Sequence, residues 1–409
     1  MQHIIVVAME TGGNQQCRAR ITTGVVFWLG GDMVLGMNLL ERFLACMEYE
    51  DPDRVPNWEL GAWPQTVQRW EAEGLDVQRL HWGWFNGEAE LGMDEREFIH
   101  INSRMIPQFK TKVLEEDGQT QLIRDAQGRV RRTLKAGAVG GARMSMDTYE
   151  RFPVENRGDW EELKKRYDPT HPRRYEANWR IVRPAGWAAR QHPLILGQNC
   201  STLGFYWMAR EWMGTEPLSY AWYDQPELCH DMMEFWADFL IEITRPVLEV
   251  TGVEYVCLNE DLAMKTGPLL SPETYREFIY PRLRRVVEFF KSHGVRYVAI
   301  DSDGNPELIV PMMMDAGVDI LWPLERAAGQ DPVRIRKKFG KTLRLWGGVD
   351  KRELAKGPEA IDAHLRAMAP LIEEGGFIPS VDHTVPPDIG WGNFRHYMER
   401  KRKLLEGRM

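Results

Sequence analysis

The amino-acid sequence predicts an α/β protein, specifically a (β/α)8 TIM barrel with an antiparallel hairpin inserted near the barrel mouth. Short runs of β-branched and aromatic residues alternate with longer segments whose apolar residues recur about every 3.6 positions. After residue 250 the order strand, helix, strand repeats closely, which is typical of a parallel sheet. No low-complexity linker interrupts this order, so we expect a single barrel domain.

The predicted strands number seven, and an eighth is less well defined. The seven are 54–60, 193–199, 254–260, 296–301, 319–325, 343–348 and 376–382. Amphipathic helices are predicted between them, for example over 271–294 and 305–317. We place the eighth strand near 108–117. This count favours a closed barrel over an open doubly wound sheet.

Two segments depart from the strand and helix alternation. Residues 111–135 read as an antiparallel hairpin with turns at Asp117-Gly118 and Gln127-Gly128, which we expect beside the barrel mouth. Residues 1–36 have a patchy apolar pattern, without the basic start and small-residue cleavage site of a secretory signal. We therefore expect 1–36 to be an N-terminal extension, either disordered or a misassigned start, and 37–409 to form the barrel.

Composition excludes several classes of function. A net charge of -8, without a long run of Lys or Arg, argues against a nucleic-acid partner. Five cysteines without paired spacing are typical of a reduced, cytoplasmic chain. Because no stretch offers about 18 consecutive apolar residues, a membrane span is not expected.

The polar residues at the predicted strand ends are the candidates for chemistry, because barrels of this kind place their sites there. They are Asn57, Glu59, Gln198, Asn199, Asn259, Glu260, Asp261, Asp301, Asp303, Glu325, Asp350, Ser380, Asp382 and His383. Such an acidic mouth suits a cation, protons or a polar neutral substrate.

The motif "IDSDGNPEL" ends a predicted strand with two carboxylates. Turn and capping preferences account for Gly304 and Asn305, and Asp303 is an alternative helix cap, but these preferences do not account for Asp301. His383 follows the last strand; it is either a loop imidazole bonded to backbone or a site residue. Together Asp301, Asp303 and His383 offer an oxygen and nitrogen ligand set that suits zinc, manganese or ferrous iron.

The motif "CLNEDLAMKTGPLLSP" supplies further candidates. Glu260 and Asp261 are predicted, with Asp301, as catalytic acids or bases, and Lys265 as a contact to an anionic substrate group. The alternative for Lys265 is an ion pair with a neighbouring acid. The predicted substrate-binding residues are Glu59, Asn199, Asn259, Lys265, Glu325 and Asp350.

Several segments resemble the uroporphyrinogen decarboxylase superfamily, whose other branch contains cobalamin or coenzyme M methyltransferases. They include "NLLERFLACMEYEDPDRVP", "LRLWGGVDKREL" and "EEGGFIPSVDHTVPPDI", and the resemblance spans roughly residues 37–405. It implies a (β/α)8 barrel, in agreement with the strand count.

Two departures from the family patterns bear on activity. True uroporphyrinogen decarboxylases carry an Arg-rich "RQAGRYLPEY" type segment, but "NWELGAWPQTVQRW" has no arginine before Arg69, so that activity is not expected. The methyltransferase branch binds zinc through a His-x-Cys pair and a later Cys, and these positions fall on Asp301, Asp303 and His383. Thiolates are thus replaced by harder ligands.

The resemblance therefore implies a methyltransferase that acts on a small methylated compound and a cobalamin carried by a separate corrinoid protein. A decarboxylase or lyase of a small carboxylic acid, with Asp301 or Glu260 as proton donor, is the main alternative. A corrinoid carrier is a third, although the Asp-x-His-x-x-Gly motif of such carriers does not occur in the sequence.

Overall fold

The computed structural model describes residues 6–8, 20–22, 25–29, 32–76, 85, 87–135, 138–139, 142–143, 147–198 and 202–408. Within 1–36 the described segments form two antiparallel pairs. These are β1 (Val6–Ala8) with β2 (Arg20–Thr22), and β3 (Val25–Leu29) with β4 (Asp32–Gly36). The rest of the predicted N-terminal extension lies outside the described residues, and the domain boundary at residue 37 stays a prediction.

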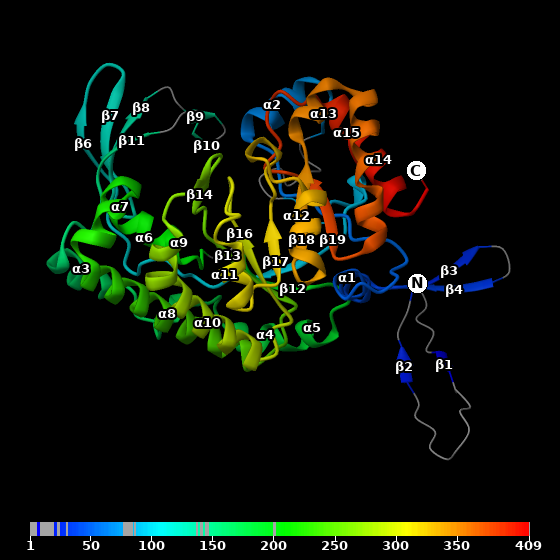
Figure 1. Ribbon diagram of the computed structural model, residues 1–409, viewed down its shortest axis with the longest axis horizontal. Helices are drawn as coiled ribbons and strands as arrows, with labels where there is room; N and C mark the ends of the chain where they lie inside the picture. Colours follow the sequence, from blue (N-terminus) through cyan, green and yellow to red (C-terminus); the bar gives the residue numbers. More distant parts are fainter. Residues whose placement is uncertain are drawn as a thin grey trace, which may run out of the picture.

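A curled sheet of seven parallel strands forms the centre of the protein (Figure 1). Its order is β19 (Phe377–Val381), β18 (Arg344–Val349), β17 (Ile320–Trp322), β16 (Tyr297–Asp301), β13 (Tyr255–Asn259), β12 (Leu194–Gly197) and β5 (Glu97–Ile99). All neighbouring pairs are parallel, so the carboxyl ends of the strands lie at one edge. The α/β class and the parallel sheet are confirmed, with the curvature of a TIM-like fold.

Two strand predictions were wrong. The segment 108–117, predicted as a strand of the parallel sheet, contains β6 (Lys112–Glu116) of an antiparallel sheet. The parallel sheet contains β5 instead. The segment 54–60 forms no ladder. An extended stretch, residues 55–62, which we call the closing segment, instead runs beside β19 with one parallel bridge between Ala62 and Val385.

The closing segment is irregular because side chains replace part of its backbone ladder. The Val381 N–H donates to Glu59 Oε2 at 2.9 Å, while the Asp94 N–H donates to the Asn57 carbonyl at 3.0 Å. The closing segment therefore bonds to β19 on one side and to the approach to β5 on the other, where an eighth strand would lie.

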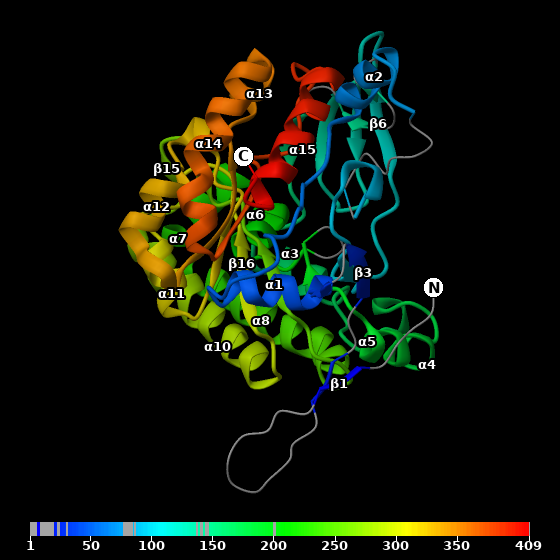
Figure 2. The same cartoon turned by 90° about the vertical axis from the view of Figure 1, so that its right-hand side faces the viewer.

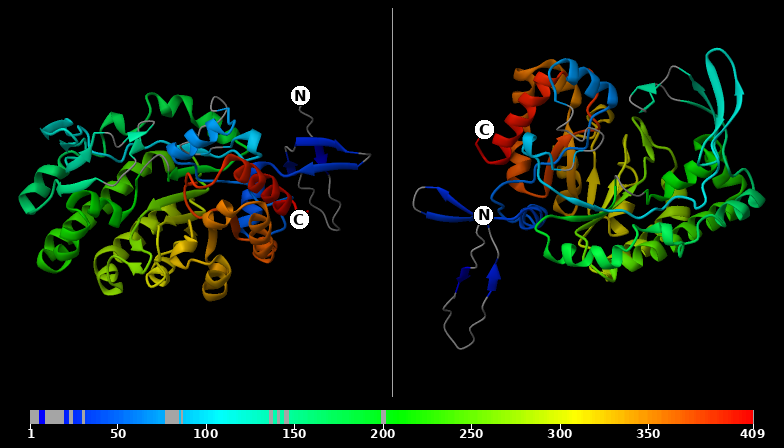
Figure 3. Two further views of the ribbon diagram at one scale, coloured as in Figure 1. Left: turned by 90° about the horizontal axis from the view of Figure 1, so that it is seen from above. Right: turned by 180° about the vertical axis from the view of Figure 1, so that it is seen from behind.

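The predicted hairpin is part of a four-stranded antiparallel sheet. Its order is β11 (Thr148–Arg151), β8 (Val130–Leu134), β7 (Thr120–Arg124) and β6. The two expected turns are present, since β6 pairs with β7 and β7 with β8. Figure 3 (right panel) shows these strands, in cyan, rising on the side to which the parallel strands point.

Helices surround the sheet, and α8 and α10 run side by side along its outer face (Figures 1 and 2). The helices have the following bounds. They are α1 (Leu39–Met47), α2 (Pro64–Ala72), α3 (Arg157–Lys164), α4 (Trp179–Val182), α5 (Pro184–Ala189), α6 (Phe205–Met213), α7 (Thr215–Asp224), α8 (Pro226–Leu248), α9 (Pro272–Thr274), α10 (Tyr280–Ser292), α11 (Val310–Asp315), α12 (Pro332–Phe339), α13 (Lys351–Lys356), α14 (Pro358–Glu374) and α15 (Trp391–Leu405). The predicted helix over 271–294 is confirmed: Ser271 caps α9, and a π-helical turn joins α9 to α10. None of the described helices is both long and apolar enough to span a bilayer.

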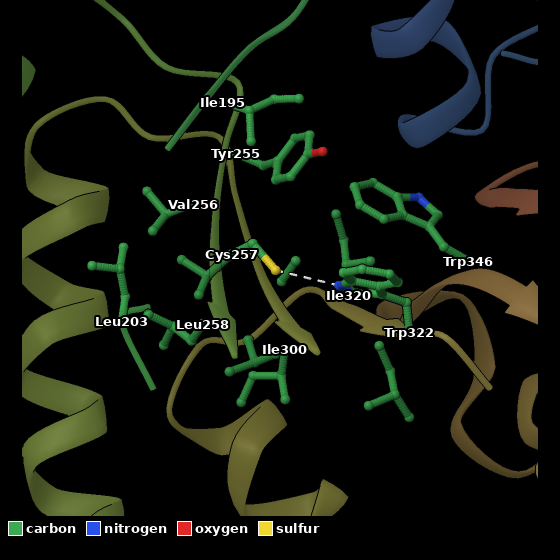
Figure 4. Close-up of a cluster of buried hydrophobic side chains, with 14 of the residues drawn as sticks. Ile195, Leu203, Tyr255, Val256, Cys257, Leu258, Ile300, Ile320, Trp322 and Trp346 are labelled. Atoms are coloured by element: carbon green, nitrogen blue, oxygen red, sulfur yellow. Dashed lines mark hydrogen bonds between the residues drawn. The ribbon is translucent and has the colours of Figure 1, made fainter. Parts of the chain in front are cut away.

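Aliphatic and aromatic side chains pack together around the strands of the curled sheet (Figure 4). Tyr255 and Trp346 meet edge to face with ring centroids 4.8 Å apart. Trp322 donates from Nε1 to Cys257 Sγ at 3.3 Å. Cys257 is a buried free thiol, as are Cys46 and Cys229, and each packs as a small core residue. Trp322 of this layer also lines the pocket described below.

Candidate functional site

A pocket of about 610 Å³ opens at the carboxyl ends of the parallel strands. Its lining is Leu60, Ala62, Trp63, Pro64, Arg104, Gln198, Thr202, Trp207, Asn259, Asp261, Asp301, Asp303, Trp322, Pro323, His383 and Thr384. Acidic groups line one part of the wall, and tryptophans line much of the rest. The volume is that of a site for a small organic molecule.

Three carboxylates converge in this pocket. Asp301 ends β16, Asp303 follows two residues later, and Asp261 follows β13. Each offers an oxygen within 4.8 Å of the others. The strand register explains the meeting, because Asn259 of β13 pairs with Asp301 of β16. Asp261 has a φ of 41°, a left-handed conformation that redirects the chain as it leaves the strand.

The convergence raises the proton affinity of Asp301 and Asp261. Burial and the charges of Asp261 and Asp303 raise the pKa of Asp301 well above its usual range. Burial and the charge of Asp303 raise the pKa of Asp261 to about 6, although Arg210 acts in the opposite sense. A proton or a bound cation therefore neutralises part of this charge near neutral pH.

His383 lies on the outer side of Asp303. Its Nε2 is 3.1 Å from Asp303 Oδ2, and its ring stacks on Trp63 with centroids 6.1 Å apart. Burial opposes the charged imidazolium, but the hydrogen bond and charge of Asp303 prevail and raise the pKa of His383. Of the predicted ligand set, the structure thus places Asp301 and Asp303 in the three-carboxylate group, and Asp261 takes the position that we had expected for His383.

Asn259 adds an unused oxygen to the site. Its Nδ2 donates to Asp301 Oδ2 at 2.8 Å, which orients the amide. Its Oδ1 is buried in the pocket wall without a hydrogen-bond partner in the described structure. A buried acceptor without a partner is costly, so this oxygen is poised for a ligand or a cation.

Three predicted site residues lie outside the pocket lining and have structural contacts instead. Glu260 is buried and accepts the N–H groups of Phe205 (3.0 Å) and Tyr206 (2.7 Å) at the start of α6. Burial raises its pKa to about 7, against the effect of those bonds. Asp350 caps α13 and pairs with Arg352 at 2.7 Å.

Glu59, the third of these residues, forms a fully buried ion pair with Lys401 at 2.6 Å. In the structure, Glu59, Glu260 and Asp350 therefore have structural contacts rather than the catalytic or substrate contacts that their strand-end positions suggested.

The remaining predicted residues lie at the rim or beyond. Glu325 accepts from the Gly304 N–H at 2.9 Å and from Lys351 Nζ at 3.1 Å, and so supports the turn that carries Asp303. Lys265 is exposed between β14 (Ala263–Met264) and β15 (Gly267–Pro268). Asn199 lies outside the described residues.

Sequence reasoning missed two arginines of the site. Arg210 of α6 donates from Nη1 to the Asp261 carbonyl at 3.1 Å, and its Nη2 is 3.5 Å from Asp261 Oδ2. Arg104 lines the pocket from the loop after β5. The strand-end rule would have found Arg104 if β5 had been recognised. Arg210 carries no such signal, because it lies within a helix.

Comparison with known proteins identifies the family of this chain. The family model described as uroporphyrinogen decarboxylase (URO-D) matches residues 200–404, half of the chain. The chain belongs to the URO-D family. Asp261, Asp301, Asp303 and His383 all lie within the matched residues.

Two curated relatives of this URO-D family chain each match less than half of it. The uroporphyrinogen decarboxylase of Nocardia farcinica is 29% identical over 188 residues, which cover 44% of this chain and 50% of that protein. That of Rhodococcus erythropolis is 32% identical over 177 residues, covering 41% and 46%. The chain thus spans about half the length of the curated relatives that it matches.

A solved structure covers more of the chain. A methyltransferase from Methanosarcina mazei superposes with a TM-score of 0.54 and 14% identity, covering 90% of this chain and 99% of that one. This likeness shows a shared fold. Family and fold thus agree with the resemblance, and the activity has to be argued from the pocket.

Proposed function

We propose that this URO-D family chain is a methyltransferase that moves a methyl group between a small methylated compound and a cobalamin held by a separate corrinoid protein. The observation that carries the proposal is the meeting of Asp261, Asp301 and Asp303 in a pocket of about 610 Å³ with tryptophan walls. Only the fold is shared with the Methanosarcina mazei methyltransferase, so the proposal rests on the chemistry of the pocket.

Demethylation needs a group that stabilises the leaving atom. When the bond between a methyl carbon and an oxygen breaks, its electron pair stays on the oxygen, which then takes up a proton, while the methyl passes to the acceptor. Asp301 suits the donor role because its raised pKa retains a proton near neutral pH. The pair formed by Asp303 and His383 borders the same space and would return the proton.

The three carboxylates also fit a divalent cation. Asp261, Asp301 and Asp303 would hold it, and the buried Asn259 Oδ1 offers a further oxygen. Such an all-oxygen set suits manganese, ferrous iron or zinc as a Lewis acid that polarises the leaving oxygen. It does not suit the activation of a thiol, for which sulfur ligands are preferred.

A carboxy-lyase that acts on a small acid is the second candidate. The curated relatives are uroporphyrinogen decarboxylases, and a proton-holding Asp301 could equally protonate the carbanion left by carbon dioxide. Uroporphyrinogen itself is a poor fit, because several carboxylates would have to enter a pocket whose lining holds three aspartates and a single arginine.

The test is methyl transfer to cob(I)alamin under anaerobic conditions, assayed over methoxy and methylamine compounds. We expect transfer from at least one donor, and a loss of about a hundredfold or more in Asp301→Asn, since a positioned general acid contributes that much. Asp388→Asn is the matched control, because Asp388 is an exposed carboxylate in the loop that follows His383 and lies outside the pocket lining.

Two results would redirect the proposal. Absence of transfer from every donor, together with carbon dioxide release without cobalamin, would establish the lyase instead. Metal analysis of Asp261→Ala, Asp301→Ala, Asp303→Ala and His383→Ala separates the two forms of the site. Equal metal content in the wild type and all four variants would leave the carboxylates as proton donors only.

A further inference from the structure

Arg104 is the positively charged residue of the pocket that has no bonded acid. Its side chain is exposed and lines the same cavity as Asp301 and Asp303. No hydrogen bond or ion pair from its guanidinium is formed within the described part of the chain, where the only bond donated by Arg104 comes from its backbone N–H. The five N–H donors of the guanidinium therefore border the pocket without an acceptor among the described residues.

The other arginines near this wall are already paired. Arg210 bonds Asp261. Arg129 Nη1 binds both oxygens of Glu211, at 2.7 and 2.6 Å. Glu211 interacts electrostatically with Arg104, but the Glu211 carboxylate is already bonded to Arg129. Arg104 thus differs from these two arginines in having no side-chain partner among the residues that the structure describes.

A buried arginine holds the backbone of Arg104 in place. Arg174 is fully buried, and its guanidinium donates to the carbonyls of Arg104, Asn102 (2.8 Å) and Asp168 (2.9 Å) rather than to a carboxylate. In return the Asn102 N–H donates to the Arg174 carbonyl at 2.7 Å.

Burying a charged group to bond carbonyl oxygens is costly. In return, the bonds of Arg174 stabilise the loop after β5. The Arg104 N–H also donates to Asn102 Oδ1 at 3.0 Å. Arg104 is therefore presented from a fixed backbone, the arrangement that reduces the entropy lost when a ligand binds.

We propose that Arg104 is the anion-binding residue of the pocket and that the substrate carries a carboxylate on a flat, apolar body. A guanidinium matches a planar carboxylate through two parallel hydrogen bonds. Trp63, Trp207 and Trp322 supply flat apolar surfaces to the lining of the pocket that Arg104 and the three aspartates share. The orientation of the methyl-bearing end toward Asp301 rests on the proposed function, whereas the binding of the anion does not.

The test is a binding measurement that needs no methyl transfer. Benzoate and benzamide, which have the same shape but differ in charge, are titrated into the full-length protein by calorimetry at low salt. We expect the wild type to bind benzoate about tenfold or more tightly, since charge-assisted hydrogen bonds are the strong ones. Arg104→Gln should bind the two equally, and Arg104→Lys should keep part of the preference.

The matched control is Arg173→Gln, because Arg173 is exposed, lies in the short 3-10 helix Pro172–Arg174 and does not line the pocket. It should bind as the wild type does. The proposal is overturned if the wild type shows no preference, if it binds neither compound, or if Arg104→Gln keeps the preference while its circular dichroism matches the wild type. A protein that prefers benzoate through Arg104 but transfers no methyl group would refute the proposed function and leave this inference standing.

Discussion

The buried ion pair between Glu59 and Lys401 predicts that one distant substitution will weaken the pocket. Both side chains have 0% exposure, and Lys401 Nζ lies 2.6 Å from Glu59 Oε1. Glu59 also accepts from the Tyr397 hydroxyl at 2.5 Å and from the Val381 N–H at 2.9 Å. These bonds attach the closing segment, which carries the pocket residues Leu60 and Ala62 and is followed directly by Trp63, to α15 and β19.

The expected magnitude follows from the charges. At 2.6 Å two unit charges attract by about 6 kcal/mol for an effective dielectric constant of roughly 20. Desolvation of the two ions offsets most of this attraction. In Lys401→Met, however, Glu59 stays buried without its counter-ion, which costs about 3–5 kcal/mol of unfolding free energy.

The assay is urea unfolding followed by circular dichroism, with benzoate titration as a measure of the pocket. Lys401→Met should lower both the unfolding free energy and the affinity. The double variant Glu59→Gln with Lys401→Met removes both charges and should recover to within about 1–2 kcal/mol of the wild type. A loss below about 1 kcal/mol in the single variant, or no recovery in the double variant, would show that the buried charge does not control this segment.

Three further predictions concern the supports of the site. Gly204→Ala should lower the unfolding free energy measured in urea by about 2–3 kcal/mol, because a Cβ there would lie 1.6 Å from the Asn259 carbonyl oxygen. Gly252→Ala is the control and should be nearly neutral, because a Cβ there would meet no atom within 4 Å. Arg174→Met should reduce the benzoate preference several-fold although Arg104 is unchanged, because the loop loses its bonds, and an unaltered preference would contradict this positioning role.

The third of these predictions is a pH dependence. The hydrogen bond that His192 donates to Glu97 raises the pKa of His192 above 6.5, so the stabilisation from this pair is complete below that value and is lost as the pH rises through the raised pKa. His192→Asn should therefore lose up to about 1 kcal/mol at about pH 5.5 and almost nothing at about pH 8.5, and equal losses at both would refute the assignment.

The strands that were predicted well share a clear physical signal. The segments 254–260 and 296–301 are continuous apolar runs bounded by turn residues, as expected for strands covered on both faces, and β13 and β16 fall within them. Their parallel register then brings Asn259 beside Asp301. This part of the site was predictable because it depends only on where two strands end.

The missed strand and the misassigned residues lacked such a signal. β5 has three residues, too few for a period to show, and the closing segment has a suitable composition but is held by the side chains of distant residues. Glu260 and Asp261 are neighbours in sequence, yet one binds the start of α6 and the other faces Asp303. Which neighbour faces the pocket depends on α6 and on a left-handed backbone at Asp261.

The acidic residues at the strand ends form two groups. In the first group the protein compensates the charge of each carboxylate, and in the second it does so only in part. Glu59 has Lys401, Glu260 has the first N–H groups of α6, and Asp350 has Arg352. Asp261, Asp301 and Asp303 have mainly one another, although Arg210, Asn259 and His383 bond them at the edge.

A set of like charges held together at such cost is stable only with a proton or a cation between them. The same reasoning applies in reverse to Arg104, a cation that bonds no acid among the described residues. The two uncompensated charges of opposite sign therefore define the polarity of the expected ligand: a proton-accepting or metal-binding end toward Asp301, and an anionic end toward Arg104.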